Sequence, residues 1–248
     1  MKKGEFFIRD IVSKKVKASH ARISEIFLSY QGEGSFTGSR QLFVRFYGCN
    51  LACIYCDTIL DGYKVFSPEK LLNEVSSRGR EYNEFTLTGG EPLLHADFLK
   101  VFLPLYKKKF NNKRIYLETN GTLSYELDMI IDYIDIIAMD FKLPCSGLSG
   151  GNIGKEHWRF IEKAVSKDLI VKAVITSDTG MDAIKKMTDV LKSVRGNFII
   201  ILQPVTPVNS LAEKPDTEML SYFERYIFKE TGKPTRIMGQ AHKYLGIK

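Results

Sequence analysis

The sequence is poor in cysteine and has no long apolar run. Its four cysteines among 248 residues are too few and too unevenly placed for the disulfide framework of a small secreted protein. No apolar stretch approaches the roughly 18 to 20 residues that a membrane-spanning helix needs. Lys2 and Lys3 open the chain, but the apolar stretch after them is too short for a secretory signal. These absences predict a protein of the reducing cytoplasm that does not enter a membrane.

Linkers, internal repeats and low-complexity segments are also absent from the sequence. A chain of 248 residues is long enough to bury the core of one α/β barrel-type domain. We therefore expect residues 1–248 to form a single domain. Residues 1–22 would be an N-terminal extension, which ends in a lysine-rich stretch and could add a strand or a dimer arm.

Three of the four cysteines lie within eight residues, at Cys49, Cys53 and Cys56. Three thiolates on one loop can bind three irons of a [4Fe–4S] cluster and leave the fourth iron open for a ligand. A structural zinc loop is the alternative, but such loops usually present paired C-x2-C sequences and need a fourth ligand. Cys145 could supply that ligand, although nothing around it has the spacing of a metal site. The pattern favours the cluster, and we expect Cys145 to be a half-buried bystander.

Strands alternate with helical stretches along the chain, which predicts a parallel sheet. The expected strands are residues 41–47, 84–88, 114–119, 136–140, 169–176, 197–203 and 235–238, with an earlier strand at Ile23. Helices are expected from Ser67 and over residues 96–108, 123–133, 155–167, 181–194 and 216–231. The predicted fold class is α/β, a partial (β/α)6 TIM-type barrel.

Polar residues follow several of these strands, at the edge where barrel enzymes carry their sites. They include residues 89–91 after the second strand of the parallel series, 118–121, 140–142 and 203–206. Gly89 and Gly90 allow backbone to approach a ligand closely, and Glu91 can accept a hydrogen bond from an amine. Each group alone could be a capped turn. Their repetition at one edge predicts a ligand site.

The segment before the cysteines carries a second polar loop. Gln31 and Glu33, each followed by glycine, could recognise donors and acceptors on a heterocycle edge. Arg45 lies on the strand that leads to Cys49, and its forked guanidinium suits a carboxylate. A mobile turn and a surface ion pair are the simpler alternatives. Because both elements are joined to the cysteine loop, we expect a substrate site beside the cluster.

The cysteine loop has the pattern C-x3-C-x-Φ-C, with Tyr55 at the aromatic position, and resembles the signature of the radical S-adenosylmethionine (SAM) superfamily. The Thr-Gly-Gly-Glu-Pro sequence at 88–92 resembles the motif with which such enzymes hold the SAM amino group. From about Ile23 to Lys248 the chain resembles the 7-carboxy-7-deazaguanine synthase family. The resemblance rests on Gln-Gly-Glu-Gly at 31–34, Phe-Val-Arg at 43–45, Glu-Thr-Asn-Gly at 118–121 and the terminal residues 240–248.

This resemblance implies a carbon–nitrogen lyase that converts 6-carboxy-5,6,7,8-tetrahydropterin to 7-carboxy-7-deazaguanine with loss of ammonia. The implied cofactors are a [4Fe–4S] cluster, SAM and Mg2+, with SAM regenerated in each cycle. The product would enter queuosine or other 7-deazapurine biosynthesis.

The resemblance also assigns site residues. The SAM contacts would be Tyr55, Gly90, Glu91, Asp140, Phe141, Lys142, Gln203, Pro204, Val205 and Thr206. The substrate contacts would be Tyr30, Gln31, Gly32, Glu33, Arg45, Thr88 and Lys248. Thr58 would bind Mg2+, which rests on the resemblance alone because a lone threonine is a weak magnesium signal. No side chain is expected to be catalytic beyond the cluster and SAM.

The formal charge of +7, from 36 Lys plus Arg and 29 Asp plus Glu, bears on partners. The lysine runs at 14–17 and 107–109 lack the interleaved aromatics of a single-strand nucleic-acid surface. We expect a solvated basic surface, no direct nucleic-acid partner, an acidic flavodoxin or ferredoxin as reductant, and a homodimer. The alternatives are a glycyl-radical-enzyme activase, which shares the cysteine spacing, and a basic nucleic-acid-binding module with a structural metal.

Overall fold

The computed structural model describes residues 20–58, 61–148, 153–207 and 212–247, whose strands form one nine-stranded sheet. The strands are β1 (Ala21–Tyr30), β2 (Arg40–Phe46), β3 (Lys64–Phe66), β4 (Glu84–Gly89), β5 (Arg114–Thr119), β6 (Ile136–Asp140), β7 (Asp168–Ile175), β8 (Ile199–Pro204) and β9 (Thr235–Ile237). Their order is β3-β1-β2-β4-β5-β6-β7-β8-β9. β1 runs antiparallel to β2 and β3, and the other neighbours pair in parallel. The sheet ends at β3 and β9, so the predicted partial barrel is confirmed.

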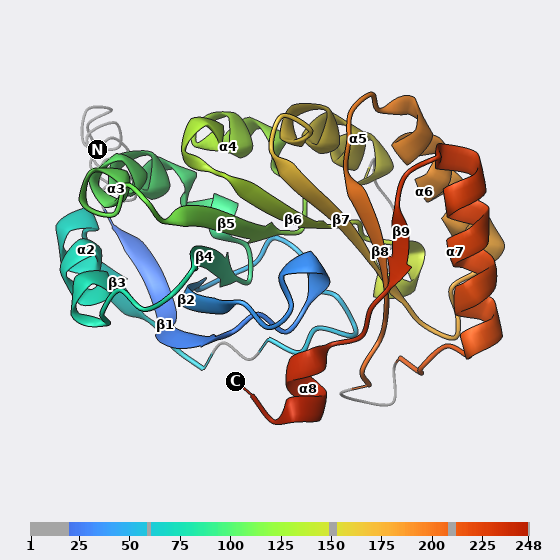
Figure 1. Cartoon of the computed structure of the whole chain (residues 1–248), viewed down its shortest axis with the longest axis horizontal. Coiled ribbons are helices and arrows are strands. Elements are labelled where there is room, and N and C mark those ends of the chain that lie inside the picture. Colours follow the sequence, from blue (N-terminus) through green and yellow to red (C-terminus); the bar gives the residue numbers. More distant parts are fainter. Residues whose placement is uncertain (1–19, 59–60, 149–152, 208–211, 248) are drawn as a thin grey trace, which may run out of the picture.

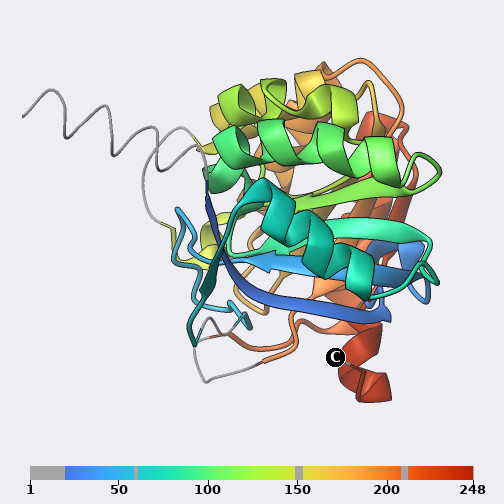
Figure 2. The ribbon, with the colours of Figure 1, turned by 90° about the vertical axis from the view of Figure 1, so that its left-hand side faces the viewer.

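Helices follow most of the parallel strands and cover the outer face of the sheet (Figure 1). They are α2 (Pro68–Ser77), α3 (Ala96–Lys109), α4 (Ser124–Asp128), α5 (Ile153–Ala164), α6 (Met181–Ser193) and α7 (Thr217–Thr231). The short helix α8 (Ala241–Leu245) lies apart from them, below the strands in Figure 2, where α3 and α4 lie above. The long helices therefore leave the inner face of the sheet uncovered, and the C-terminal segment lies on that side. None of the helices in the described ranges is long and apolar enough to cross a membrane.

Local sequence explains where the helices begin and end. The Ser67 hydroxyl accepts a hydrogen bond from the Lys70 backbone N–H at 3.2 Å, and Pro68 occupies the first helical position of α2. Asp216 caps α7 in the same way, through the N–H of Met219 at 2.6 Å. Gly232 ends α7 with a φ of 66°, a left-handed conformation that glycine adopts without strain. These caps place the helices as the sequence predicted.

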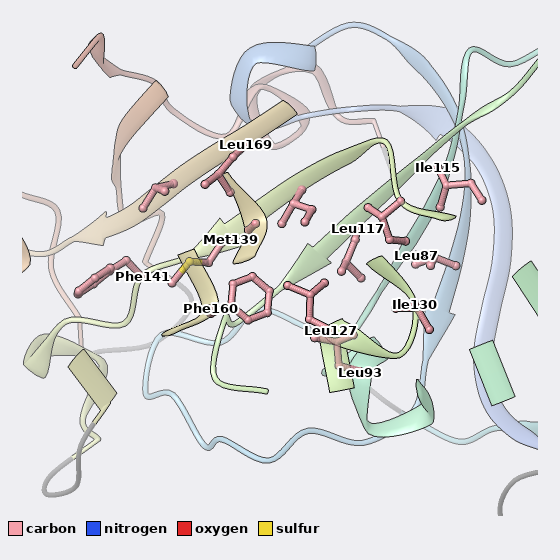
Figure 3. Packing of buried hydrophobic residues seen from close by; sticks show 14 of the residues in the cluster. Leu87, Leu93, Ile115, Leu117, Leu127, Ile130, Met139, Phe141, Phe160 and Leu169 are labelled. Atoms are coloured by element: carbon pink, nitrogen blue, oxygen red, sulfur yellow. The ribbon is translucent and has the colours of Figure 1, made fainter. Parts of the chain in front are cut away.

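The core fills the space between the strands and the outer helices (Figure 3). Leu87 on β4 and Leu117 on β5 are fully buried there, as are Leu127 from α4 and Phe160 from α5. Burial of a large apolar side chain stabilises the fold by about 1.5 to 3 kcal/mol. This packing holds the strands in register, so that the loops at their carboxyl ends keep fixed positions.

Three elements differ from expectation. The helix expected over 123–133 is instead α4 followed by a 3-10 turn over Ile131–Tyr133, because the β-branched pair Ile130 and Ile131 has low helix propensity. β3 and α8 were not predicted, and with three and five residues they are too short to show periodicity. Residues 1–19 of the expected extension lie outside the described residues, while Ala21 and Arg22 begin β1.

Candidate functional site

A cavity of about 660 Å³ opens on the inner face of the sheet, at the carboxyl ends of the parallel strands. It brings together most of the residues that the sequence singled out. Its lining includes Tyr30, Gln31, Gly32, Glu33, Arg45, Cys49, Cys53, Tyr55, Cys56, Thr58, Thr88, Gly90, Asp140, Lys142, Gln203, Val205 and Thr206. Glu91, Phe141 and Pro204 do not line it, and Lys248 lies outside the described residues.

The cysteine loop forms one wall of this cavity. Cys49, Cys53 and Cys56 are free thiols, of which Cys53 is half-buried. Burial raises the pKa of Cys53, while the ammonium of Lys142 acts to lower it. In the described part of the chain, no three His, Cys, Asp or Glu side chains are arranged around a single metal ion. A [4Fe–4S] cluster needs no such convergence, because each thiolate binds a different iron, so the donor set fits a cluster.

Two glycines let the end of β4 lie directly against the cysteine loop. A Cβ atom at Gly90 would lie 2.2 Å from the carbonyl oxygen of Gly48 and 3.0 Å from the Cβ of Cys49. Gly89 has a φ of 137°, and a Cβ there would lie 2.2 Å from the carbonyl oxygen of Phe46. The backbone N–H of Glu91 donates to Gly48 at 2.9 Å. Glycine is therefore required here by close backbone contact.

Glu91 braces the loop after β5. Its side chain is fully buried, and its carboxylate accepts from the Leu93 N–H at 3.0 Å, the Thr119 hydroxyl at 2.9 Å and the Asn120 N–H at 2.8 Å. Burial raises the pKa of Glu91 to about 7, against the lowering effect of these hydrogen bonds. The carboxylate thus points at the loop rather than into the cavity.

The loop after β5 in turn supports the cysteine loop. The side-chain amide of Asn120 donates to Asn50 Oδ1 at 2.8 Å and approaches Cys49 Sγ at 3.9 Å. The backbone carbonyl oxygen of Asn120 accepts from His157 Nε2 at 3.1 Å, so Nε2 carries the proton. His157 is fully buried, its ring centroid lies 4.3 Å from that of Phe141, and burial lowers its pKa to about 4. Phe141 is therefore part of the packing behind the site.

The shifted pKa values of Glu91 and His157 predict opposite effects of pH on the free energy of unfolding. The folded-state pKa of His157 lies below its ordinary value of 6.5, so its contribution is lost as pH falls from about 6.5 toward 4. The pKa of Glu91 lies above its ordinary value of 4.5, so its contribution falls as pH rises from about 4.5 through 7. Between pH 7 and 5 each effect amounts to about 2 kcal/mol, with opposite sign.

Urea unfolding at pH 7 and pH 5 tests this balance in two variants. His157→Leu should gain about 2 kcal/mol of stability at pH 5 relative to pH 7, compared with the unsubstituted chain. Glu91→Gln should lose a similar amount in the same comparison. If both variants kept the pH dependence of the unsubstituted chain, neither group would titrate between these pH values as its burial implies.

Four charged groups lie along the floor of the cavity. Lys142 Nζ lies 2.9 Å from Asp140 Oδ2 and 5.5 Å from the ring centroid of Tyr55. Lys172 Nζ contacts Glu33 Oε2 and lies 3.6 Å from Asp140 Oδ2. Burial alone would lower the pKa of both lysines, but the adjacent carboxylates raise it above its ordinary value. The floor is thus a fully ionised network that joins the Gln31–Glu33 loop to β6 and β7.

The C-terminal segment closes one side of the cavity. Gln240 Nε2 donates to Glu33 Oε1 at 2.7 Å and to Asp57 Oδ2 at 3.3 Å. Lys243 Nζ lies 2.9 Å from the same oxygen of Asp57. A Cβ at Gly32 would lie 2.1 Å from His242 Nδ1, so this glycine lets the segment approach. Residues from both ends of the chain therefore enclose the site.

Arg45 and Thr88 are neighbours on β2 and β4, paired in register. The Arg45 side chain lies 3.2 Å from Glu25 Oε2, and its guanidinium carbon lies 5.4 Å from the centroid of the Phe27 ring. Thr88 is buried. Both line the cavity beside the cysteine loop, as the substrate assignment requires.

Sequence reasoning missed Gln41, Lys172 and His157, and it marked Glu118 only as part of the polar group at 118–121. Gln41, Glu118 and Lys172 lie on strands, and Lys172 and Glu118 line the cavity. The sequence did contain a signal for the strand residues, because polar residues at every second position of a buried strand indicate that one face of the strand is polar. Glu84, Thr86 and Thr88 show this alternation on β4. His157 lies on α5 and has no such signal.

Comparison with known proteins places this geometry in a family. The family model described as the radical SAM superfamily matches residues 43–176. The 7-carboxy-7-deazaguanine synthase of Geobacter sulfurreducens is 33% identical, covering 91% of this chain and 97% of that one. That of Archaeoglobus fulgidus is 32% identical, covering 92% and 99%. The crystal structure of QueE from Escherichia coli matches with a TM-score of 0.60 at 20% identity, covering 88% and 94%, and supports the fold.

These findings decide among the alternatives that the sequence left open. The matched residues 43–176 include the three cysteines and the polar ends of β4, β5 and β6. The similarity to the Geobacter and Archaeoglobus relatives covers 91% and 92% of this chain. The chain therefore belongs to the radical SAM superfamily and, within it, to the 7-carboxy-7-deazaguanine synthase family.

Proposed function

We propose that this protein converts 6-carboxy-5,6,7,8-tetrahydropterin to 7-carboxy-7-deazaguanine, with loss of ammonia. The observation that carries the proposal is the composition of the single cavity described above. The cysteine loop, the polar ends of β4 and β6, and the Gln31–Glu33 loop with Arg45 all contribute to its lining. An enzyme of this kind must hold a cluster, SAM and a pterin within reach of one another.

Membership in the radical SAM superfamily implies a [4Fe–4S] cluster and SAM. Bound together, they supply a radical that abstracts hydrogen from an unactivated carbon, which protein side chains cannot do. Cys49, Cys53 and Cys56 would bind three irons. The SAM site would include Tyr55, Gly90, Asp140, Lys142, Gln203, Val205 and Thr206, all of which line the cavity.

For SAM, the chain itself supplies charge and shape. Asp140 and Lys142 form a buried ion pair beside Tyr55, which suits a zwitterionic ligand with an aromatic base. Asp140 Oδ1 is buried and has no hydrogen-bond partner among the described residues, so a ligand donor would satisfy it. Glu91 would affect SAM binding indirectly, by holding the loop after β5 in place through its hydrogen bonds. Direct contacts of SAM with Glu91, Phe141 and Pro204 stay predictions.

For the pterin, Arg45 would bind the carboxylate, and Thr88 would lie beside it. The loop formed by Gln31, Gly32 and Glu33 would recognise the ring, with Tyr30 at the rim. Mg2+ at Thr58 would fix the same carboxylate and orient it for rearrangement. The support for this arrangement is that all these residues line the same cavity.

The proposal extends to partners and compartment. A low-potential cluster needs a reductant, and an acidic flavodoxin or ferredoxin would complement the formal charge of +7. We also propose a homodimer that functions in the cytoplasm, where thiols stay reduced and the cysteine loop can remain available to iron.

Anaerobic turnover tests the proposal. Reconstituted protein with dithionite, SAM, Mg2+ and 6-carboxytetrahydropterin should form 7-carboxy-7-deazaguanine and ammonia, detected by mass spectrometry and an ammonia assay. Thr58→Val should need more Mg2+ for the same rate, because it removes the proposed ligand while keeping the side-chain volume. Cleavage of SAM with the pterin left intact would keep the superfamily and contradict the substrate.

A further inference from the structure

A chain of buried polar side chains lies behind Gln31. Gln41 and Thr86 are fully buried, and Glu84 and Gln31 are 2% and 4% exposed. Gln41 on β2 and Glu84 on β4 are paired in register, so this row of polar side chains runs across two neighbouring strands. None of the roles proposed above accounts for Gln41, Thr86 or Glu84. A buried polar network of this kind stabilises one arrangement of donors and acceptors.

The donor and acceptor roles in this row of hydrogen bonds are set at its Glu84 end. Arg114 Nη2 lies 2.6 Å from Glu84 Oε1, and the Ser39 hydroxyl donates to Glu84 Oε2. Both oxygens of Glu84 thus accept hydrogen bonds. Gln41 must therefore turn its NH2 group toward Glu84, at 3.2 Å from Oε2.

The amide oxygen of Gln41 is thereby turned toward Gln31. It accepts from the Thr86 hydroxyl at 2.6 Å and from Gln31 Nε2 at 3.3 Å. Gln31 Nε2 also donates to Glu118 Oε1 at 2.8 Å, so both of its N–H groups are used inside the protein. The oxygen of Gln31 accepts from the Glu33 N–H at 3.1 Å. A flipped Gln31 amide would place oxygen against two acceptors and NH2 against a donor.

The orientation of the Gln31 amide decides whether the cavity offers hydrogen-bond donors or acceptors to the ring of a bound ligand. Glu118 lines the cavity, and among the described residues its carboxylate accepts from Gln31 through Oε1 alone. With the Gln31 donors occupied, this edge of the cavity offers oxygen acceptors. The pyrimidinone edge of a pterin carries N–H donors on its exocyclic amino group and adjacent ring nitrogen. An analogue with a second carbonyl in place of the amino group presents an acceptor there.

We propose that Gln41 is a positioning residue that fixes the amide orientation of Gln31, and so makes the site select a ring edge with N–H donors. Gln41 does not touch the ligand and acts through Gln31 and Glu118. This inference rests on the proposed function, because it names the part of the pterin that the site recognises.

Steady-state kinetics of the reconstituted enzyme test the inference, with the 2-oxo analogue of the substrate as competitor. Gln41→Met keeps the side-chain length but removes the acceptor, so KM for the pterin should rise about tenfold with little change in kcat. Discrimination against the analogue should fall by a similar factor. Ser39→Ala is the matched control, because it removes a donor to Glu84 and leaves the bond between Gln41 and Gln31 in place.

Two further measurements separate positioning from a general packing defect. In a Gln31→Met background, Gln41→Met should add no further rise in KM, whereas an independent structural defect would add its own. Glu84→Gln conserves the side-chain shape but allows the amides to reverse, and should lower discrimination even where Gln41→Met fails to fold. Normal turnover of the unsubstituted enzyme, with discrimination unchanged in Gln41→Met and Glu84→Gln, would overturn the inference. Absence of product from the unsubstituted enzyme would overturn the proposed function and this inference with it.

Discussion

Cys53→Ser is expected to abolish cluster binding and product formation together. Cys53 is the half-buried thiol of the cysteine loop and lies on the cavity wall near Lys142. Serine has a far higher pKa than cysteine and is a poor ligand for iron. Iron should fall from about four per chain to well below one after reconstitution. The loss of turnover should exceed the roughly 10-fold to 100-fold cost of losing an outer-shell partner.

Cys145→Ser is the matched control for this experiment. Cys145 is half-buried, with its Sγ 3.7 Å from the Val174 carbonyl oxygen and 3.3 Å from the Thr179 hydroxyl. A serine hydroxyl can keep both contacts, so iron content and turnover should stay within about twofold of the unsubstituted enzyme. Equal loss of metal in both variants would contradict the three-cysteine assignment and revive a four-cysteine metal site.

Gly90→Ala is expected to disrupt the site with a single methyl group. The added Cβ would lie 2.2 Å from the carbonyl oxygen of Gly48, and this contact is between backbone segments that cannot rotate away. The cysteine loop must shift, and Cys49 shifts with it. Overpacking of this kind costs about 1 to 3 kcal/mol of stability. We expect poor iron incorporation, weak SAM binding by equilibrium dialysis, and a lower melting temperature.

Gly154→Ala serves as the control for Gly90→Ala. Gly154 lies in α5, and a Cβ there meets nothing within 4 Å. Alanine is a better helix former by about 1 kcal/mol, so stability should hold or rise. If Gly90→Ala took up iron and SAM as fully as Gly154→Ala, the close contact between β4 and the cysteine loop would not be needed for the site.

The sequence predicted the parallel part of the fold well, because buried strands alternate with capped helices. Glu84–Gly89 and Arg114–Thr119 agree with the expected strands to within a residue. β3 was missed because three residues are too few to show a pattern. The expected helix over 123–133 is interrupted before the β-branched pair Ile130 and Ile131, whose low helix propensity the predicted range did not take into account. Single-domain organisation over residues 1–248 stays a prediction.

The site was predicted where chemistry is local and missed where it depends on distant partners. The cysteine loop and the Gly89–Gly90 pair are local patterns with a direct physical meaning. The contact of Gln240 with Glu33 joins residues 207 positions apart, and no local pattern reports it. The Glu91 carboxylate accepts a hydrogen bond from Asn120 at the end of another strand, which no local pattern reports, and its contact with SAM stays a prediction.

The anaerobic reaction of the reduced holoenzyme tests the central claim most directly when product is counted against SAM lost. The proposed function treats SAM as a regenerated cofactor that would share one cavity with the pterin. Several molecules of 7-carboxy-7-deazaguanine should therefore form for each SAM consumed, and no product should form without the cluster. Steady loss of SAM with the pterin recovered unchanged would contradict it.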